Sequence, residues 1–325
     1  MTMNRREFMA AGALGMASGL VRLASGRELD AGLLPYKTAP GVSGSISSIG
    51  SDTLANLMTY WAEAFQKNYP NVSVQIESKG SGTAFPALIA GTSQFGPMSR
   101  AAKPTEEDQF ESRYGYKATQ VRVAVDAVGI FVNKDNPLQS ISLDQLDAIY
   151  SKARRRGVRK ASTTWGDVGL TGEWGNKSIS LFGRNSASGT YGFFKENVMK
   201  TGDFRDEVKE QPGTASVILG VAEDRTAIGY GGIGYSTSSV RAISLSEHDG
   251  EASKTPTAAN AYSGDYPLSR YLYIYINRAP GKPLTPIVQE FIRMVCSKEG
   301  QQLVAKDGFF PLKSATAAEE LRKVD

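Results

Sequence analysis

The chain has 325 residues, of which 41% are hydrophobic and 22% are charged, and its formal net charge at pH 7 is +4. This length allows two domains with sizeable cores, and the composition excludes a largely disordered chain. So small a charge does not require a nucleic-acid partner and supports only a mild attraction for anions.

The first 26 residues have the pattern of an export signal. Arg5 and Arg6 precede Phe8, and the stretch of Ala, Gly and Leu that follows is too short and too glycine-rich to span a bilayer. The paired arginines resemble the twin-arginine export motif, which implies export of the folded protein. We therefore predict cleavage near Ser25 or Gly26 and a mature protein that is soluble in the periplasm.

From residue 44 onward, patterns typical of strands and helices alternate along the chain, whereas residues 27–43 lack a clear periodicity and are interpreted as a linker. Strands are expected at 45–51, 72–78, 94–100, 121–137, 178–184 and 269–277. Helices are expected at 54–70, 83–91 and 141–151, after residue 192, and as one long region at 285–308. This alternation predicts an α/β protein with largely parallel sheets and flanking helices.

Several conspicuous segments have ordinary structural interpretations. Residues 152–162 are predicted to be a solvated basic loop, because no aromatic residues are interleaved with the charges as in a nucleic-acid site. Gly229, Gly231 and Gly234 match a dinucleotide-binding pattern, but no amphipathic helix follows, so they are interpreted as a turn between two strands. Cys296, the only cysteine, is expected to be buried on a helix.

Three glycine-bounded loops, 50–54, 79–85 and 184–192, share one architecture. In each, a strand ends, small hydroxyl residues follow and a helix begins. One interpretation is a capped helix N-terminus. The other is an oxyanion site, because glycine lets backbone N–H groups approach closely and hydroxyl groups are directional donors. Since such loops lie together at the carboxyl ends of parallel strands, a shared oxyanion explains three of them better than three separate caps.

Catalysis is the weaker interpretation of the same loops. The chain has no GxxxxGK[ST] motif for nucleotide phosphates. Its single histidine, His248, falls in a charged stretch and is expected to be an exposed loop residue. Without a histidine-based triad or a metal-ligand cluster, binding is favoured over turnover, and neither a metal nor a cofactor is expected.

Over most of the mature length, the chain resembles the phosphate-binding proteins of high-affinity phosphate ABC transporters. The resemblance rests on GSDTL, KGSGTAF, QFGPMSR, RNSASGTYG, AIGY and PLSRYLYIYIN, which occur in the family's order and spacing. It implies a two-lobed, type II-like periplasmic-binding-protein fold whose lobes close on phosphate. The phosphate-binding positions that it implies are Ser51, Thr53, Leu54, Ser81, Arg184, Ser188, Gly189 and Thr190.

The chain departs from the family pattern after FGPM. The family carries an aspartate there that accepts a hydrogen bond from protonated phosphate, whereas this chain has Ser99 followed by Arg100. Asp52 is the only acid within the three loops; it either replaces the missing carboxylate or caps the helix that starts at Leu54. Arg100 is either a second anion contact or a surface or interlobe residue.

The resemblance also implies how the chain is divided and what it meets. Lobe one is expected to combine residues 44–126 with 268–325 and lobe two to span 127–267, with strands 123–131 and 269–277 crossing between them. The implied partners of this monomeric binding protein are inorganic phosphate and a membrane ABC permease, with no nucleic acid. A binder of another oxyanion such as sulfate, or a secreted phosphatase on the same fold, are the alternatives.

Overall fold

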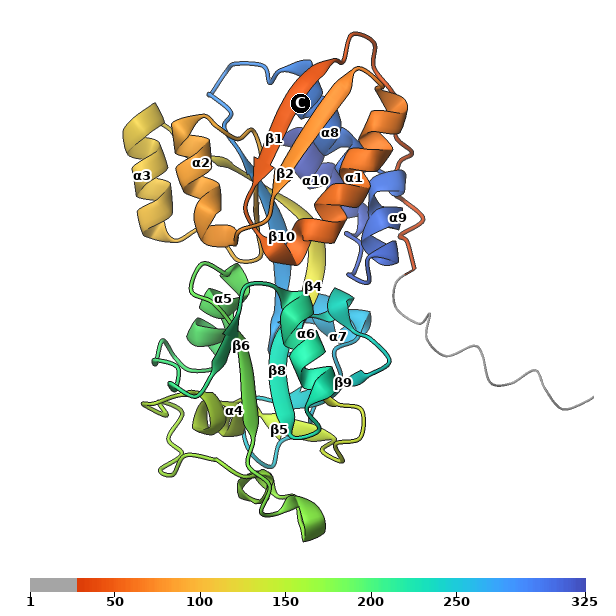
Figure 1. Cartoon of the computed structure of the whole chain (residues 1–325). Coiled ribbons are helices and arrows are strands. Elements are labelled where there is room, and N and C mark those ends of the chain that lie inside the picture. Colours follow the sequence, from red (N-terminus) through yellow and green to blue (C-terminus); the bar gives the residue numbers. More distant parts are fainter. Residues whose placement is uncertain (1–27) are drawn as a thin grey trace, which may run out of the picture.

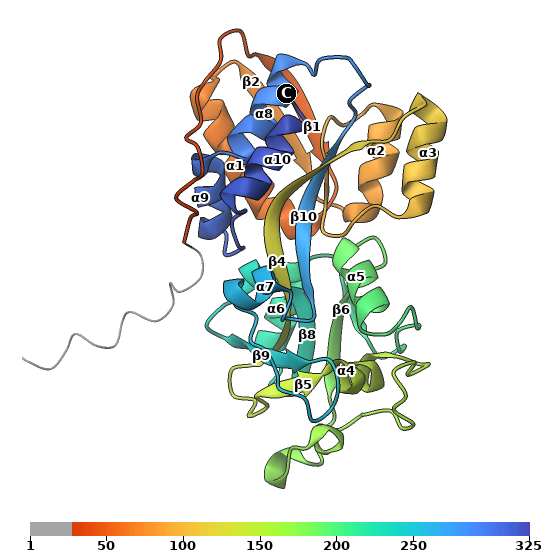
Figure 2. The same cartoon turned by 180° about the vertical axis from the view of Figure 1, so that it is seen from behind.

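The computed structural model describes residues 28–325, so the predicted export signal lies outside the described residues. Two lobes are stacked end to end, and two long strands run from one lobe into the other (Figures 1 and 2). These strands are β4 (Thr119–Asn133) and β10 (Ser269–Ile276). The expected crossings, 123–131 and 269–277, fall within or next to them.

Lobe one is an α/β unit made from both ends of the described chain. Its strands are β1 (Gly44–Ile49), β2 (Val72–Glu77) and β3 (Gly96–Met98). Its helices are α1 (Ala55–Asn68), α2 (Ala84–Ala90), α3 (Pro104–Tyr114), α8 (Pro286–Val295), α9 (Lys298–Lys306) and α10 (Ser314–Arg322). Residues 28–43 pack on this lobe, where Leu33 and Val42 join the core formed around Trp61, Phe65 and Phe291.

Lobe two is the second α/β unit. Its strands are β5 (Ser140–Ser142), β6 (Ser180–Arg184), β7 (Lys209–Gln211), β8 (Ala227–Gly232) and β9 (Val240–Ser246). Its helices are α4 (Leu143–Tyr150), α5 (Gly189–Asn197), α6 (Thr214–Glu223) and α7 (Ala258–Ser263). Its core includes Tyr150, Phe194 and Tyr230, and the rings of Phe194 and Tyr230 stack with centroids 4.0 Å apart.

The predicted α/β fold with flanking helices is confirmed, but the sheets are less parallel than expected. Parallel pairs occur inside the lobes, between β1 and β2, β6 and β7, β6 and β8, and β5 and β9. The crossing strands β4 and β10 pair antiparallel with each other and with their neighbours β3, β8 and β9. Two strands that connect the same two lobes in opposite directions must be antiparallel where they pair.

Two sequence interpretations are wrong in detail. Gly229 and Gly231 do not form a turn but lie inside β8, where added Cβ atoms would come within 2.7 Å of Val217 and 2.5 Å of Thr214 on helix α6. The glycines are therefore needed for close packing of helix on strand. The expected long helix at 285–308 is two helices, α8 and α9, and Cys296 is the buried C-terminal cap of the first.

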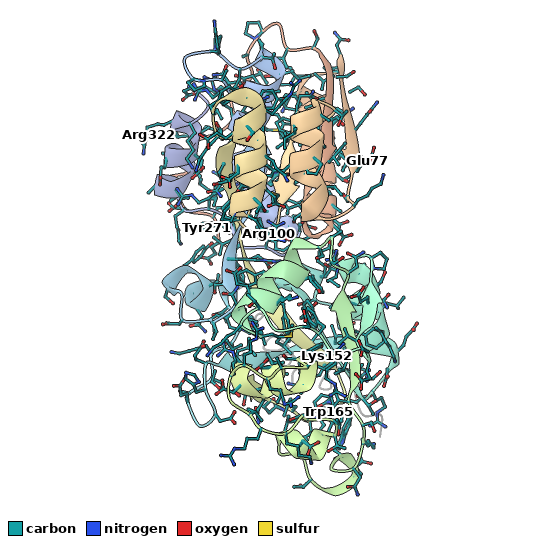
Figure 3. The ribbon with its side chains drawn as sticks, turned by 90° about the vertical axis from the view of Figure 1, so that its left-hand side faces the viewer. Glu77, Arg100, Lys152, Trp165, Tyr271 and Arg322 are labelled. Atoms are coloured by element: carbon teal, nitrogen blue, oxygen red, sulfur yellow. The ribbon has the colours of Figure 1, made fainter. Side chains whose placement is uncertain are left out.

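The basic loop is not simply a solvated surface segment. Arg156 has a largely covered side chain, which pairs with Glu247 at 2.7 Å and donates from Nε to the Val198 carbonyl at 2.6 Å. It therefore ties the loop to lobe two, whereas its neighbour Arg155 is exposed. Lys152, at the start of this loop, lies well away from the boundary between the lobes (Figure 3). Within residues 28–325, every helix is too short or too polar to cross a lipid bilayer.

Asp307, in the connection that follows α9, makes stability depend on pH. Burial raises the pKa of this carboxyl to about 7, and its Oδ2 has no hydrogen-bond partner. A carboxyl with a raised pKa in the folded state holds its proton after the unfolded chain has lost it. Its contribution to the free energy of unfolding is therefore lost as pH rises from about 4 to about 7.

Asp307→Asn should remove this loss. We compare the free energy of unfolding of the variant with that of wild type at each pH. The variant minus wild-type difference should be about 1–3 kcal/mol higher at pH 8 than at pH 4, because only the wild type loses stability as pH rises. Urea denaturation of both proteins across this range measures the difference. A difference that is constant with pH would show that Asp307 ionises normally in the fold.

Candidate functional site

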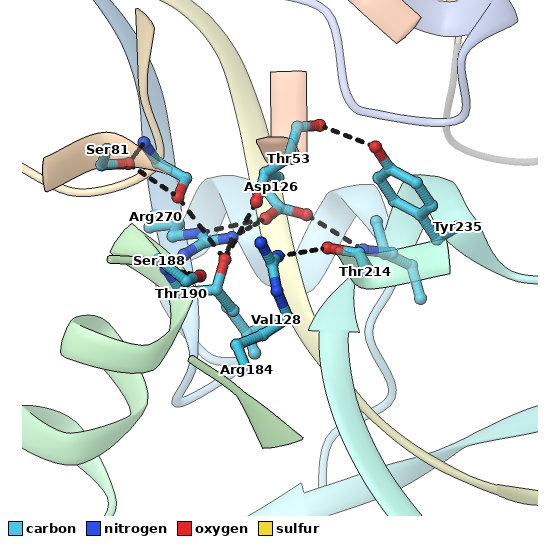
Figure 4. A network of polar contacts seen from close by, with 12 residues as sticks. Thr53, Ser81, Asp126, Val128, Arg184, Ser188, Thr190, Thr214, Tyr235 and Arg270 are labelled. Atoms are coloured by element: carbon cyan, nitrogen blue, oxygen red, sulfur yellow. Dashed lines mark hydrogen bonds and ion pairs between the residues drawn. The ribbon is translucent and has the colours of Figure 1, made fainter. Parts of the chain in front are cut away.

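The three predicted loops converge at the boundary between the lobes, as they were expected to do. The first two belong to lobe one and continue as short 3-10 helices, η1 (Asp52–Leu54) and η2 (Ser81–Thr83), while the third precedes α5 of lobe two. Five of their hydroxyl residues are almost completely buried, namely Ser51, Thr53, Ser81, Ser188 and Thr190, and so is Ser99, which follows β3. Figure 4 shows this cluster around the crossing strands.

Hydrogen bonds run directly from one lobe to the other within the cluster. The Thr53 and Thr190 Oγ1 atoms are 3.0 Å apart, and Ser99 Oγ lies 3.4 Å from Thr190 Oγ1. The backbone N–H of Gly82 donates to the Ala187 carbonyl at 3.0 Å. These contacts are possible only when the lobes are closed on each other.

Gly189 lets the lobes approach this closely. It is the first residue of α5, and a Cβ added to it would lie 2.3 Å from Ser81 Oγ and 2.7 Å from Ser99 Oγ. Any side chain at this position would therefore push into the hydroxyl groups of lobe one. Leu54, the remaining backbone position expected in the site, is buried at the start of α1.

Ser188 caps helix α5, and this role is compatible with a place in an oxyanion site. Its Oγ accepts hydrogen bonds from the Thr190 and Tyr191 N–H groups at the start of α5. The hydroxyl proton is still available for donation, because a serine hydroxyl can accept and donate at once. A helix N-terminus also carries partial positive charge, which favours an anion nearby.

Arg184 ends β6 beneath the cluster and is 1% exposed. Its Nη1 donates to Thr214 Oγ1 at 2.6 Å and its Nη2 to the Pro212 carbonyl at 3.1 Å, while the buried Nε has no partner. Burial lowers the pKa of Arg184 below its ordinary value, and the charge of Asp52 opposes that change. The guanidinium is thus held in place through both Nη atoms, while its Nε–H stays available to a further acceptor.

A buried ion pair, which the sequence analysis missed, lies on the crossing strands. Asp126 of β4 and Arg270 of β10 stand opposite each other in the sheet register, and Arg270 donates to Asp126 Oδ2 from Nε at 2.9 Å and from Nη2 at 2.8 Å. Arg270 Nη2 also lies 3.0 Å from Thr190 Oγ1, while Nη1 is buried without a partner. The available signal was Asp126 in the middle of the apolar run 123–131 and Arg270 near the start of an apolar, aromatic strand, because charged residues are rarely buried unless they are paired.

The electrostatics of this pair favour an added anion. Asp126 is fully buried, and burial raises the pKa of its carboxyl while Arg270 opposes the rise. Burial likewise lowers the pKa of Arg270, with Asp126 opposing. Arg184 is paired with Asp52 and Arg270 with Asp126, so the four side chains carry no net charge. The attraction for an anion comes instead from the two buried guanidinium nitrogens that have no partner and from the nearby start of α5.

The structure shows which of the positions considered for Arg100 and Asp52 these residues have. Arg100 forms a two-pronged ion pair with Glu106, with both distances 2.7 Å, and lies beside Gly192 of α5. It is therefore an interlobe residue at the boundary seen in Figure 3, and its guanidinium is already occupied. Asp52 does not cap its own helix: its Oδ2 accepts the Thr214 N–H of lobe two at 2.9 Å and lies 3.2 Å from Arg184 Nη2.

Comparisons with known proteins agree with this geometry. Residues 36–299 match the family model of a PBP superfamily domain. The chain is 51% identical over 317 residues to the phosphate-binding protein PstS of Pseudomonas aeruginosa, with 98% of this chain and 96% of that protein covered. The chain belongs to the PstS family of the PBP superfamily.

More distant members of the family show the same likeness. The PstS of Staphylococcus haemolyticus is 31% identical over 86% of this chain and 85% of its own length. A crystal structure from Clostridium perfringens, described as a phosphate ABC transporter substrate-binding protein with bound phosphate, is 27% identical. It superposes with a TM-score of 0.68, covering 83% of this chain and all of the other.

The ion pair can be tested by a double-mutant cycle. Arg270→Met should lower the free energy of unfolding by about 3 kcal/mol or more, because it leaves the Asp126 carboxylate buried and unpaired, and Asp126→Asn should do so by a similar amount. The double variant should lose clearly less than the sum of the two. Urea denaturation of the four proteins provides the values, and strictly additive losses would show that the two charges do not depend on each other.

Proposed function

We propose that the chain captures inorganic phosphate between its lobes and delivers it to a membrane ABC permease. The observation that carries this proposal is the closed hydroxyl cluster, in which the buried Arg184 Nε and Arg270 Nη1 have no protein partner. Buried donors are rarely left unpaired, so these two nitrogens call for an acceptor from outside the chain. The relatives are named for phosphate binding, which supports phosphate as this acceptor.

The proposed ligand set follows the converging loops. Hydrogen bonds to phosphate would come from the two arginines, from hydroxyl groups of both lobes, and from N–H groups at the helix starts. The set comprises Ser51, Thr53, Leu54, Ser81, Ser99, Arg184, Ser188, Gly189, Thr190 and Arg270. Closure places these donors in a dry environment, where each charge-assisted bond is stronger than in water.

We propose that Asp126, rather than Asp52, distinguishes phosphate from sulfate. Asp126 Oδ2 lies 3.3 Å from where a Cβ of Gly232 would sit, beside Thr53 in the cluster. Near neutral pH, phosphate keeps a proton that a carboxylate can accept, whereas sulfate has none and would be repelled. The aspartate that the family carries after FGPM would thus be replaced by one on strand β4.

The proposal extends to export, cellular compartment and oligomeric state. Residues 1–26 would act as a twin-arginine-type export signal, and the chain would work as a periplasmic monomer. It would bind without hydrolysing, because its single histidine pairs with Asp144 in lobe two, outside the cluster. Calorimetric titration with phosphate and sulfate, together with an assay for hydrolysis of a chromogenic phosphate ester, tests binding against the sulfate and phosphatase alternatives.

A matched pair of glycine substitutions on α5 tests the site. Gly189→Ala should weaken phosphate binding at least tenfold, because its methyl group would overlap Ser81 Oγ, only 2.3 Å away, and hold the lobes apart. Gly192→Ala, one turn further, should bind as wild type does, since its methyl group would meet Arg100 at an ordinary 3.5 Å. Calorimetry measures the phosphate affinity of both variants. Equal affinities for the two variants would show that phosphate binds outside this cluster.

Asp126→Asn tests selectivity. The preference for phosphate over sulfate should fall tenfold or more, equivalent to about 1.4 kcal/mol, because the amide no longer repels sulfate. The measure is the ratio of the two dissociation constants in wild type and variant, so that a general change in anion affinity cancels. A ratio within twofold of wild type would exclude Asp126 as the discriminating residue.

A further inference from the structure

Asp52 of lobe one reaches across the closed cleft to the start of helix α6 in lobe two. It lies between two cluster residues, Ser51 and Thr53, yet its carboxylate is directed away from the helix that it precedes. Oδ2 accepts the Thr214 N–H at 2.9 Å. A second contact fixes the same residue, because the Tyr235 hydroxyl of lobe two donates to the Asp52 main-chain carbonyl at 3.0 Å.

Helix α6 has no cap of its own. Its N-cap residue is Gly213, which has no side chain to accept a hydrogen bond from the first turn. A Cβ added to Gly213 would lie 3.0 Å from Asp52 Oδ1, so the glycine leaves room for the carboxylate of the other lobe. At this helix end the Thr214 N–H obtains its acceptor from Asp52, and the negative charge of Asp52 lies next to the partial positive charge of the helix.

The same carboxylate helps to fix the orientation of Arg184. Asp52 Oδ2 lies 3.2 Å from Arg184 Nη2, which also donates to the Pro212 carbonyl, while Nη1 donates to Thr214. The Asp52 side chain is 21% exposed, in contrast to the fully buried Asp126, so it lies at the edge of the cluster. From this position Asp52 can hold the Arg184 guanidinium and the start of α6 in lobe two, whereas the anion would lie deeper in the cluster.

We propose that Asp52 is a positioning residue that latches the closed lobes and thereby sets how long the anion stays bound. In the open form the Asp52 carboxylate and the α6 end face water separately, and closure joins them. The latch therefore stabilises only the closed, ligand-holding state, which makes release slower without making encounter faster. This inference rests on the proposed phosphate binding and adds the element that controls closure.

The test compares Asp52→Ala with wild type. Radiolabelled phosphate is released by rapid dilution to give the dissociation rate constant, and calorimetry gives Kd, from which the association rate constant follows. We expect dissociation at least tenfold faster, association within twofold of wild type, and an unchanged ratio of phosphate to sulfate affinity. Asp52→Asn should lie between the two, because Asn still caps the helix but lacks the charge that holds Arg184.

A second variant separates a latch from an ordinary helix cap. In Asp52→Ala/Gly213→Ser, the serine can cap α6 from within lobe two, at a backbone conformation that is extended and open to any residue. This cap stabilises open and closed forms equally. It should restore thermal stability lost in Asp52→Ala while release stays fast.

Several outcomes would overturn the proposal. Release from Asp52→Ala within twofold of wild type would show that no latch exists. Slow release regained with Gly213→Ser would reduce Asp52 to a cap, and a changed phosphate-to-sulfate ratio would make it a discriminator. Failure of the wild type to bind phosphate would overturn the proposed function and the latch together, whereas normal wild-type binding confines any failure to the latch.

Discussion

The closed arrangement depends on the ion pair between Asp126 and Arg270, which stand opposite each other on the only two long strands that join the lobes within the described residues. A buried pair of this kind is costly to desolvate and contributes little net stability by itself. Here it fixes a charged donor at the point where the lobes meet. Arg270 reaches from that point to Thr190 of lobe two, so the connection between the lobes and the binding cluster share one residue.

The fold turns this local arrangement into a site by bringing donors from distant segments together. Lobe one supplies two loops at strand ends, lobe two supplies the start of α5 and Arg184, and the antiparallel crossing strands supply the ion pair. None of these segments alone excludes water. Closure does, and it raises the strength of every hydrogen bond to a trapped anion because the surrounding dielectric constant falls.

Sequence patterns predicted the features whose residues are adjacent in the chain and missed the residue pairs that only the fold brings together. The loops at 50–54, 79–85 and 184–192 were found because strand end, glycine and hydroxyl residues are adjacent in the chain. Asp126 and Arg270 are 144 residues apart, and only strand register brings them together. For Asp52 the sequence left open a carboxylate that meets the anion or a cap of its own helix, because capping is usually local, whereas the helix end that it caps begins 162 residues later. Arg156 was interpreted as a solvated charge, because its contacts with the Val198 carbonyl and Glu247 come from distant segments of the chain.

The two carboxylates at the site have different surroundings, and this separates two properties that one residue could not control independently. Asp126 is fully buried on a crossing strand and accepts the Ile233 N–H as well as the arginine. These contacts hold the carboxylate in one orientation, as the proposed discrimination between a protonated and an unprotonated oxyanion requires. Asp52 is partly exposed at the rim and bonds to a helix end that moves with the other lobe. A change at the rim would then alter residence time while the choice of anion is kept, which suits the proposed selective capture of phosphate and its release to a transporter.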